Sequence, residues 1–216
     1  MTDAAAAIRD QPLIAIDVVP MSFVTADGLR VATARRAYAP YAGQEALPGV
    51  LLDGTEILAD GAMRALRAKA GLGLGAVRHL AQVGAFDGPD RDPRSAAISI
   101  AFVAVIDPAA DSDATWHEVD ALPLGLPFDH DRIVGSALAR ARGLLWSDLP
   151  FTQALLGDPF TTADAARLRV ALTGTAPDPG NLNRKLRTNP ALARVAAPSS
   201  AGPRGGRPPA AWTWQD

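Results

Sequence analysis

Residues 50–72 read VLLDGTEILADGAMRALRAKAGL, and this stretch decides the expected fold. Its apolar residues recur at helical spacing between Glu56 and Ala70, and Gly71 stands where a helix usually stops. We therefore predict a helix over residues 56–70, which Gly61 weakens by about 1 kcal/mol relative to alanine.

The spacing in this stretch resembles the Nudix box, a pyrophosphate-cleaving motif written G-x5-E-x7-R-E-U-x-E-E-x-G-U with U apolar. The matching residues are Glu56, Arg64, Leu66, Gly71 and Leu72. The first glycine of the box is replaced by Val50, and its later glutamates are replaced by Ala65, Ala68 and Lys69. Alanine and lysine supply no oxygen ligands for a hard divalent cation. The resemblance therefore implies the shape of the hydrolase without its metal site, and we expect no catalytic and no metal-binding residues.

Composition and charge bound the class of protein. The chain has 216 residues, which suits one large domain or two modest ones. It has no cysteine, no secretory signal and no apolar run that could span a membrane, so we expect a cytoplasmic protein without a membrane partner. Residues 1–150 carry 13 basic and 19 acidic side chains, net −6, whereas residues 151–216 carry 8 and 4, net +4. The basic C-terminal third indicates a polyanion-binding module, with a solvated basic surface as the alternative.

The first two thirds of the chain alternate strands with a few helices. We predict strands over residues 13–19, 22–25, 30–34, 80–86, 97–106 and 116–119. Asp27-Gly28 reads as a hairpin turn. A second helix is expected over residues 131–145, with Asp129 or Asp131 as its N-cap. This pattern indicates an α+β sandwich over residues 12–147, preceded by a disordered N-terminus over residues 1–11.

The last third has a different organisation. We predict helices over residues 163–172 and 182–187, a Pro- and Gly-rich turn over 174–180, a basic segment over 198–210 and a strand over 211–214. Trp212 and Trp214 should face the same side of that strand and pack on the helices. The order helix, turn, helix, basic wing and strand is that of a winged helix-turn-helix over residues 151–216, and a small helical extension is the alternative.

Taken together, the segments resemble the Nudix-related bacterial transcriptional regulators of the NrtR type. The motifs that carry the resemblance are Phe86 with Arg91-Asp92-Pro93-Arg94, Ile98-Ser99-Ile100-Ala101-Phe102, Leu126-Pro127-Phe128-Asp129-His130-Asp131-Arg132-Ile133, Phe160-Thr161, Asn181-Leu182-Asn183-Arg184-Lys185-Leu186 and Gly206-Arg207-Pro208. They stand in the expected order and cover nearly the whole chain.

This resemblance implies a Nudix-like α/β/α sandwich with a mixed sheet, followed by a winged helix. It implies a homodimeric repressor that binds a palindromic operator in double-stranded DNA and controls genes of the NAD-metabolism type or of sugar catabolism. The Nudix-like domain would sense ADP-ribose or a related nucleotide and would need no cofactor. The first alternative is a divergent Nudix hydrolase that cleaves ADP-ribose with a rebuilt metal site. The second is an inactive adaptor that binds protein rather than DNA.

The candidate ligand-binding residues are cations near the expected cleft, together with one glutamate and one histidine. They are Arg35, Arg36, Glu56, Arg64, Arg91, Arg94 and His130. Arginine suits phosphate because its planar fork donates two hydrogen bonds at once. The structural alternatives are an Arg64–Glu56 contact within the helix, an arginine–Asp92 salt bridge that holds the loop, and packing of His130.

The candidate DNA-binding residues lie on the second tail helix and in the basic segment. They are Asn183, Arg184, Lys185, Arg187, Arg204 and Arg207. Asparagine and arginine can read adenine and guanine edges, whereas lysine more often contacts phosphate. The two arginines of the flexible segment suit a wing placed against the backbone or minor groove.

Overall fold

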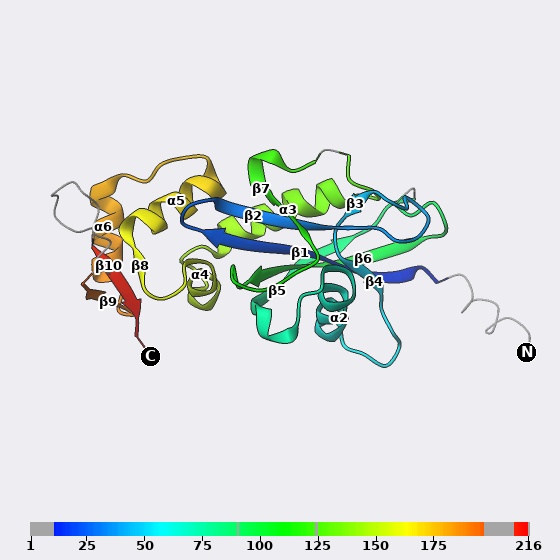
Figure 1. Cartoon of the computed structure of the whole chain (residues 1–216), viewed down its shortest axis with the longest axis horizontal. Helices are drawn as coiled ribbons and strands as arrows, with labels where there is room; N and C mark the ends of the chain where they lie inside the picture. Colours follow the sequence, from blue (N-terminus) through cyan, green and yellow to red (C-terminus); the bar gives the residue numbers. More distant parts are fainter. Residues whose placement is uncertain (1–10, 90, 124, 197–209, 216) are drawn as a thin grey trace, which may run out of the picture.

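The computed structural model describes residues 11–89, 91–123, 125–196 and 210–215. A long sheet with helices on both faces makes up one end of the molecule, and a group of short helices and strands makes up the other (Figure 1). Residues 1–10, where the disordered N-terminus is predicted, lie outside the described ranges. Within the described part, no helix is long and apolar enough to cross a membrane.

The large sheet is mixed, as predicted. Its strands are β1 (Leu13–Val24), β2 (Gly28–Arg35), β3 (Glu45–Ala46), β4 (Gly49–Leu51), β5 (Val77–Phe86), β6 (Ala97–Ile106) and β7 (Thr115–Glu118). The main order is β3-β2-β1-β6-β5, while β4 pairs with β1 and β7 pairs with β2. Strands β1 and β6 run parallel, and their neighbours are antiparallel.

Strand β1 corrects the prediction of two separate strands over 13–19 and 22–25. It is one continuous strand of 12 residues that passes through Pro20. Along one edge, β1 pairs with β4 over residues 15–17 and with β2 over residues 21–24. Pro20 falls between these two partners, where the missing N–H of proline interrupts neither ladder. The predicted hairpin turn is present, with Gly28 at a φ of 80°.

Two helices cover the opposite faces of the large sheet. The helix α2 (Leu58–Ala70) starts two residues later than predicted and ends at Gly71, whose left-handed φ of 67° closes the last turn as expected. The helix α3 (His130–Leu144) lies on the other face. Short 3-10 turns, η2 (Leu74–Ala76) and η3 (Val119–Ala121), follow α2 and β7.

Alternating side chains of the strands feed two separate cores. Val18 packs with Leu66 and the other apolar residues of α2, whereas the next residue, Val19, packs with Ile133 of α3. Strand β6 repeats the pattern, because Phe102 faces the α2 side and Val103 faces the α3 side. The two-residue period of the strands thus accounts for a sheet buried on both faces.

The C-terminal part contains three helices and a small sheet. The elements are α4 (Leu149–Leu156), β8 (Phe160–Thr161), α5 (Thr162–Thr173), α6 (Pro179–Thr188), β9 (Leu192–Val195) and β10 (Ala211–Trp214). The small sheet has the antiparallel order β8-β10-β9. The predicted tail helices correspond to α5 and α6, and the predicted strand is β10. Helix α4 and strands β8 and β9 were not predicted, and residues 197–209 of the basic segment lie outside the described ranges.

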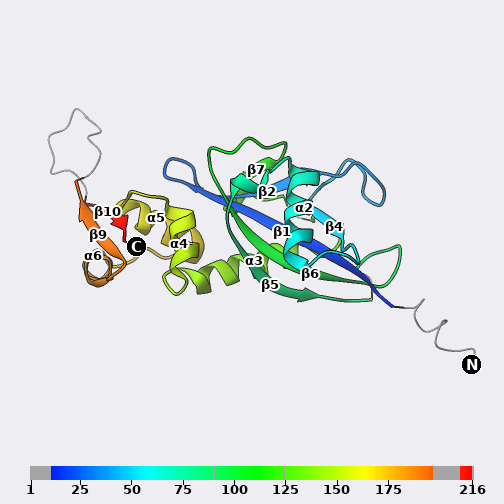
Figure 2. The ribbon, with the colours of Figure 1, turned by 90° about the horizontal axis from the view of Figure 1, so that it is seen from below.

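Both tryptophans of β10 join the core, as predicted from their spacing. Trp212 is buried, and its Nε1 donates a hydrogen bond to Thr162 Oγ1 over 2.9 Å. Trp214 stacks on Trp146 with ring centroids 6.4 Å apart. This cluster continues through α5, α4 and α3 to one face of the large sheet, so one apolar core joins the two ends of the molecule (Figure 2).

Candidate functional site: a cavity lined by cations

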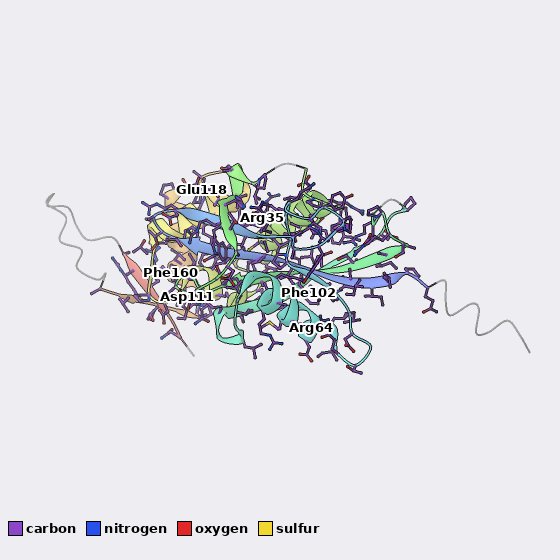
Figure 3. The ribbon with its side chains drawn as sticks, turned by 45° about the vertical axis from the view of Figure 1, so that its right-hand side comes forward. Arg35, Arg64, Phe102, Asp111, Glu118 and Phe160 are labelled. Atoms are coloured by element: carbon purple, nitrogen blue, oxygen red, sulfur yellow. The ribbon has the colours of Figure 1, made fainter. Side chains whose placement is uncertain are left out.

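A cavity of about 690 Å³ opens beside the sheet, between α2 and the start of α3. Its wall is formed by β1, the end of β2 with the loop that follows it, β4, the second half of α2, the loop over residues 91–94 and the residues that begin α3. Six of the seven predicted ligand-binding residues line it, namely Arg35, Arg36, Arg64, Arg91, Arg94 and His130. The seventh, Glu56, does not line the cavity. Figure 3 shows Arg35 at the sheet and Arg64 on α2.

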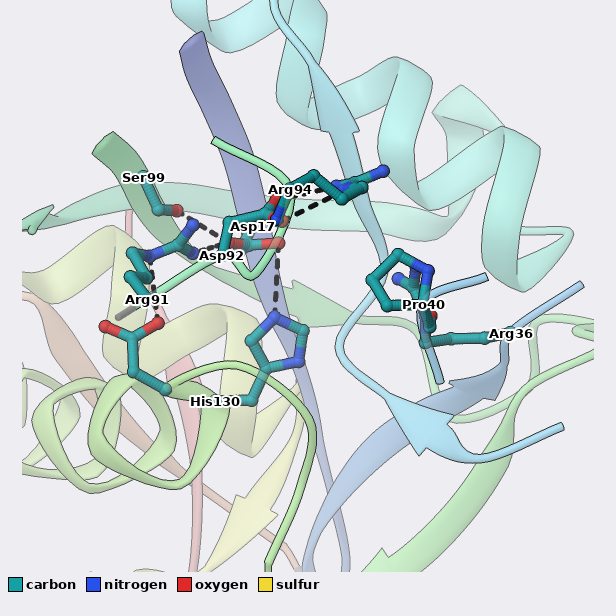
Figure 4. Close-up of polar contacts among 9 residues, drawn as sticks. Asp17, Arg36, Pro40, Arg91, Asp92, Arg94, Ser99 and His130 are labelled. Atoms are coloured by element: carbon teal, nitrogen blue, oxygen red, sulfur yellow. Dashed lines mark hydrogen bonds and ion pairs between the residues drawn. The ribbon is translucent and has the colours of Figure 1, made fainter. Parts of the chain in front are cut away.

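A buried carboxylate stands in the wall of this cavity. Asp17 on β1 is 5% exposed, and its Oδ2 accepts hydrogen bonds from Ser99 Oγ and Arg91 Nη2, each over 2.6 Å (Figure 4). His130 Nε2 lies 3.5 Å from Asp17 Oδ1. Burial raises the pKa of Asp17, but its contacts with His130, Ser99 and Arg91 outweigh burial and hold the pKa below its usual value.

Arg91 is a buried structural cation. Besides Asp17, it faces Asp129, with 2.9 Å between Arg91 Nε and Asp129 Oδ1, an ion pair whose angle is too bent for a hydrogen bond. Two carboxylates thus surround one guanidinium whose side chain is 4% exposed. The positive charge of Arg91 is therefore already balanced by the protein.

His130 is held by the backbone. Its ring is 1% exposed, and its Nδ1 accepts a hydrogen bond from the Leu47 N–H over 3.0 Å. Asp129 occupies the N-cap position of this helix, one of the two predicted, but its side chain makes no capping bond because it faces Arg91. Asp131 instead accepts bonds from backbone N–H groups of the preceding loop, at Gly125 and Leu126.

Arg64 and Glu56 contact one another, which was the structural alternative to a role of Arg64 in ligand binding. Arg64 Nε donates to Glu56 Oε2 over 3.0 Å, and Arg64 Nη2 donates to the Leu51 carbonyl oxygen over 2.7 Å. These bonds from Arg64, with a further bond from the Asp53 N–H, lower the pKa of Glu56 to about 2. Arg64 also lines the cavity. Its Nε and Nη2 groups already donate hydrogen bonds to Glu56 and to the Leu51 carbonyl oxygen.

The loop that follows β5 contains a second occupied arginine. Arg94 Nε and Nη2 donate to the two oxygens of Asp92, over 2.9 and 2.6 Å. This pairing raises the pKa of Arg94 and lowers that of Asp92. The Arg94 side chain is still 49% exposed, and its Nη1 makes no hydrogen bond within the described residues.

Three further cations face the cavity without a carboxylate partner among the residues described. They are Arg35, Arg36 and Lys69. Arg36 Nε donates a hydrogen bond to the Pro40 carbonyl oxygen over 2.9 Å. Arg35 and Lys69 are exposed. An excess of positive charge therefore faces the space, which favours a multiply charged anion as occupant.

The side chains at the cavity do not fit a divalent cation. Ala68 and Lys69 line the wall at the positions of the two metal-binding glutamates of the Nudix box. The buried Asp17 has its oxygens engaged by Arg91, Ser99 and His130. Across the described ranges, no three His, Asp or Glu side chains gather as a metal site. The donor set is one for anions rather than for magnesium.

The predicted DNA-binding residues that the structure describes lie on α6. Asn183, Arg184, Lys185 and Arg187 are all exposed there. Arg184 Nη2 donates to Asn181 Oδ1 over 2.6 Å, and Lys185 Nζ lies 5.6 Å from the centroid of the Trp146 ring. Burial against that ring, together with the charge of Arg169, lowers the pKa of Lys185. Arg204 and Arg207 lie outside the described ranges.

Sequence reasoning did not select three residues of the cavity wall, Asp17, Lys69 and Phe128. Asp17 had a signal, because it is the one charged residue in the apolar run over residues 13–19. Lys69 stood in the box itself. Phe128 offered no signal beyond its motif, because its place in the wall depends on a loop conformation.

No protein-family model matches the sequence, and no curated protein matches it. Solved structures do share its fold. NrtR of Shewanella oneidensis superposes with a TM-score of 0.74 at 23% identity, covering 94% of each chain. The same protein complexed with a 27mer DNA gives 0.73 at 21% identity, over 94% of this chain and 93% of the other. Its NUDIX domain complexed with ADP ribose gives 0.51 at 23% identity, over 65% of this chain and 99% of the other. The chain therefore has the fold of a Nudix-related regulator of the NrtR type along nearly its whole length.

Proposed function

We propose that this chain is a ligand-responsive DNA-binding repressor that senses a nucleotide without cleaving it. The observation that carries the proposal is the cavity, where Arg35, Arg36 and Lys69 face the space without carboxylate partners. Lys69 and Ala68 stand where an enzyme of this shape would hold its metal. Direct cation contacts thus replace a metal bridge to phosphate.

ADP-ribose is the proposed ligand, with a related nucleotide or a sugar phosphate as the next candidate. A diphosphate carries two negative charges for the unpaired cations of the cavity. A volume of about 690 Å³ is in the range of sites for ligands of this size. The NUDIX domain of the Shewanella protein, which was solved with ADP ribose, supports the choice of ligand.

The proposed DNA-binding unit is a winged helix over residues 151–216, joined to a Nudix-like sensor over residues 12–147. Helices α5 and α6 would form the helix-turn-helix of this unit, beside the small sheet of β8, β10 and β9. The exposed Asn183, Arg184 and Arg187 give α6 a polar and basic surface that suits the major groove. The structure of the Shewanella protein with a 27mer DNA supports this part of the proposal.

The proposed assembly is a homodimer on a palindromic operator, because one winged helix reads one half-site. The proposed targets are genes of NAD metabolism. DNA upstream of the gene and of its neighbours is the first probe to test in a mobility-shift experiment. A shift that disappears in Arg184→Ala and persists in Arg140→Met, an exposed arginine on α3, supports the proposal.

Calorimetry tests the sensor half separately. ADP-ribose should bind with the same affinity in EDTA and in Mg²⁺, and it should be recovered intact. Release of AMP that requires Mg²⁺ or Mn²⁺ would establish the hydrolase instead. Loss of binding in EDTA without cleavage would contradict the direct cation contacts.

A further inference from the structure

Phe128 lies in the cavity wall with two guanidiniums over its ring. Arg36 Cζ is 4.8 Å from the ring centroid, and Arg94 Cζ is 6.0 Å from it. Tyr41 meets the ring edge-on at 5.1 Å, and His130 packs beside it at 5.3 Å. The ring is thus fixed by aromatic neighbours while it holds two cations from different loops.

The backbone at this place is held in a costly conformation. Phe128 has a φ of 61° and Tyr41 has a φ of 64°, both in the left-handed region that bulky residues rarely adopt. These two left-handed aromatic residues are in contact with one another. Strain of this kind persists where the surrounding structure enforces it, and it concentrates at binding sites.

The two guanidiniums repel one another. Burial lowers the pKa of Arg36 below its usual value, and the charge of Arg94 lowers it further. Pro40 occupies only the Nε of Arg36, and Asp92 occupies the Nε and Nη2 of Arg94. Nη groups of both arginines therefore remain to bind an anion, which would also relieve the repulsion between them.

Two other arginines of the cavity wall are less suited to a phosphate. The Arg64 fork is already engaged by Glu56 and by the Leu51 carbonyl oxygen. Asp17 and Asp129 likewise neutralise Arg91. The arginines that meet at a shared contact and keep free Nη donors are Arg36 and Arg94, while Arg35 and Lys69 face the cavity as separate exposed cations.

We infer that Arg36 and Arg94 form the seat of the diphosphate and that Phe128 is the positioning residue that holds them. This inference rests on the proposed nucleotide-sensing function and assigns the phosphates to one side of the cavity. Phe128 contributes its aromatic ring, which both guanidiniums approach, and makes no hydrogen bond to the ligand itself.

Calorimetric titration of the full chain in EDTA, with ADP-ribose and with inorganic pyrophosphate as separate probes, tests the seat. Phe128→Leu, which keeps an apolar side chain and removes the ring, should weaken the binding of both probes about 10-fold, because the two guanidiniums are no longer held in place before the anion binds. Phe128→Tyr keeps the ring and should restore wild-type affinity for both probes. Arg67→Met is the matched charge control, because Arg67 is exposed on α2 and does not line the cavity.

Arg36→Met and Arg36→Lys keep the inference testable if Phe128→Leu fails to fold. Both variants should weaken pyrophosphate binding more than 10-fold. Methionine removes the charge, and lysine keeps the charge but cannot donate two parallel hydrogen bonds as a guanidinium does. If the wild type binds ADP-ribose and all these variants bind it equally well, the seat is wrong and the proposed function stands. If pyrophosphate binds and depends on Arg36 while ADP-ribose does not bind, the seat stands and the nucleotide is wrong. A wild type that binds neither probe overturns both.

Discussion

Arg142, in the last turn of α3, donates a hydrogen bond from its Nε to the carbonyl oxygen of Leu172 over 2.8 Å. Leu172 belongs to the last turn of α5, and α3 begins with His130 in the wall of the cavity. Helix α3 thus connects the cavity to α5, the first helix of the proposed helix-turn-helix. A ligand that shifts His130 would move α3 as a unit and alter the position of α5.

Arg142→Met should uncouple the two sites. The substitution keeps the aliphatic stem and removes the bond to Leu172, so α5 no longer follows α3 closely. We expect the ratio of DNA dissociation constants with and without ADP-ribose to move toward 1 by about 3- to 10-fold, in line with typical coupling free energies. Fluorescence anisotropy with labelled operator measures both constants.

Arg140→Met is the control for this experiment, because Arg140 is an exposed arginine on the same helix. It should leave the ratio unchanged. Because coupling is reciprocal, Arg142→Met must also reduce the effect of DNA on ADP-ribose affinity by the same factor. An unaltered ratio in Arg142→Met would mean that α3 does not transmit the signal.

Asp17→Asn should strongly destabilise the fold. The variant leaves Arg91 buried with only Asp129 as a counter-charge, and breaking a buried pair costs about 3–5 kcal/mol. Denaturation in urea measures the loss. Asp27→Asn is the control, because Asp27 forms an exposed pair with Arg30 at 3.4 Å that is worth about 1 kcal/mol or less.

Asp17 also predicts a dependence of stability on pH. Its pKa is lower in the folded chain than its usual value of 3.8, so the carboxylate contributes stability above pH 3.8. That contribution is lost as the pH falls below 3.8 toward the folded pKa. Asp17→Asn should therefore flatten the fall of unfolding free energy in this window, and an unchanged acid profile would contradict the assignment.

Lys69→Met should weaken ADP-ribose binding about 10-fold, since one of the unpaired cations that face the anionic ligand is lost. The slope of log affinity against log salt should also become shallower, because one cation fewer faces the anion. Arg67→Met, two residues earlier on α2 and outside the cavity, should change neither quantity. Equal behaviour of the two variants would show that Lys69 does not contact the ligand.

Arg184→Ala should weaken operator binding by about 10-fold or more, as expected for an arginine that contacts a base edge. In the free protein, this arginine is held by Asn181 at 2.6 Å on the exposed side of α6. Binding to random DNA should fall less than binding to the operator. Undiminished operator affinity would place recognition on another element.

The sequence predicts the elements that rest on a regular period. Strand β6 and helix α2 lie where the apolar spacing predicts them. Gly71 ends α2 because glycine adopts the left-handed conformation of a helix C-cap without strain. Helix α4 was not predicted, and Pro150 lies in its first turn. Proline is compatible with the first turn of a helix, and Asp148 caps this one by accepting a bond from the Phe151 N–H over 2.9 Å.

The cavity was predictable only in part. The five predicted ligand-binding arginines stand out in the sequence as charges near apolar segments, and all five line the cavity. The sequence could not show which arginines lack a carboxylate partner, because such partners can lie far away in the chain. Asp17 and Arg91 are separated by 74 positions, and the two loops that bring Arg36 and Arg94 to Phe128 are also far apart in the chain. Pairing across such distances follows from the tertiary fold and leaves no local pattern.

One measurement tests the central claim most directly: titration of ADP-ribose into the full chain bound to labelled operator DNA, in EDTA, with the nucleotide recovered afterwards. We expect that the anisotropy changes as ADP-ribose saturates the chain, that Arg36→Met moves this change to a more than 10-fold higher nucleotide concentration, and that the ADP-ribose is recovered intact. DNA binding that does not respond to the nucleotide, or that responds only when Mg²⁺ is present and AMP is formed, would contradict it.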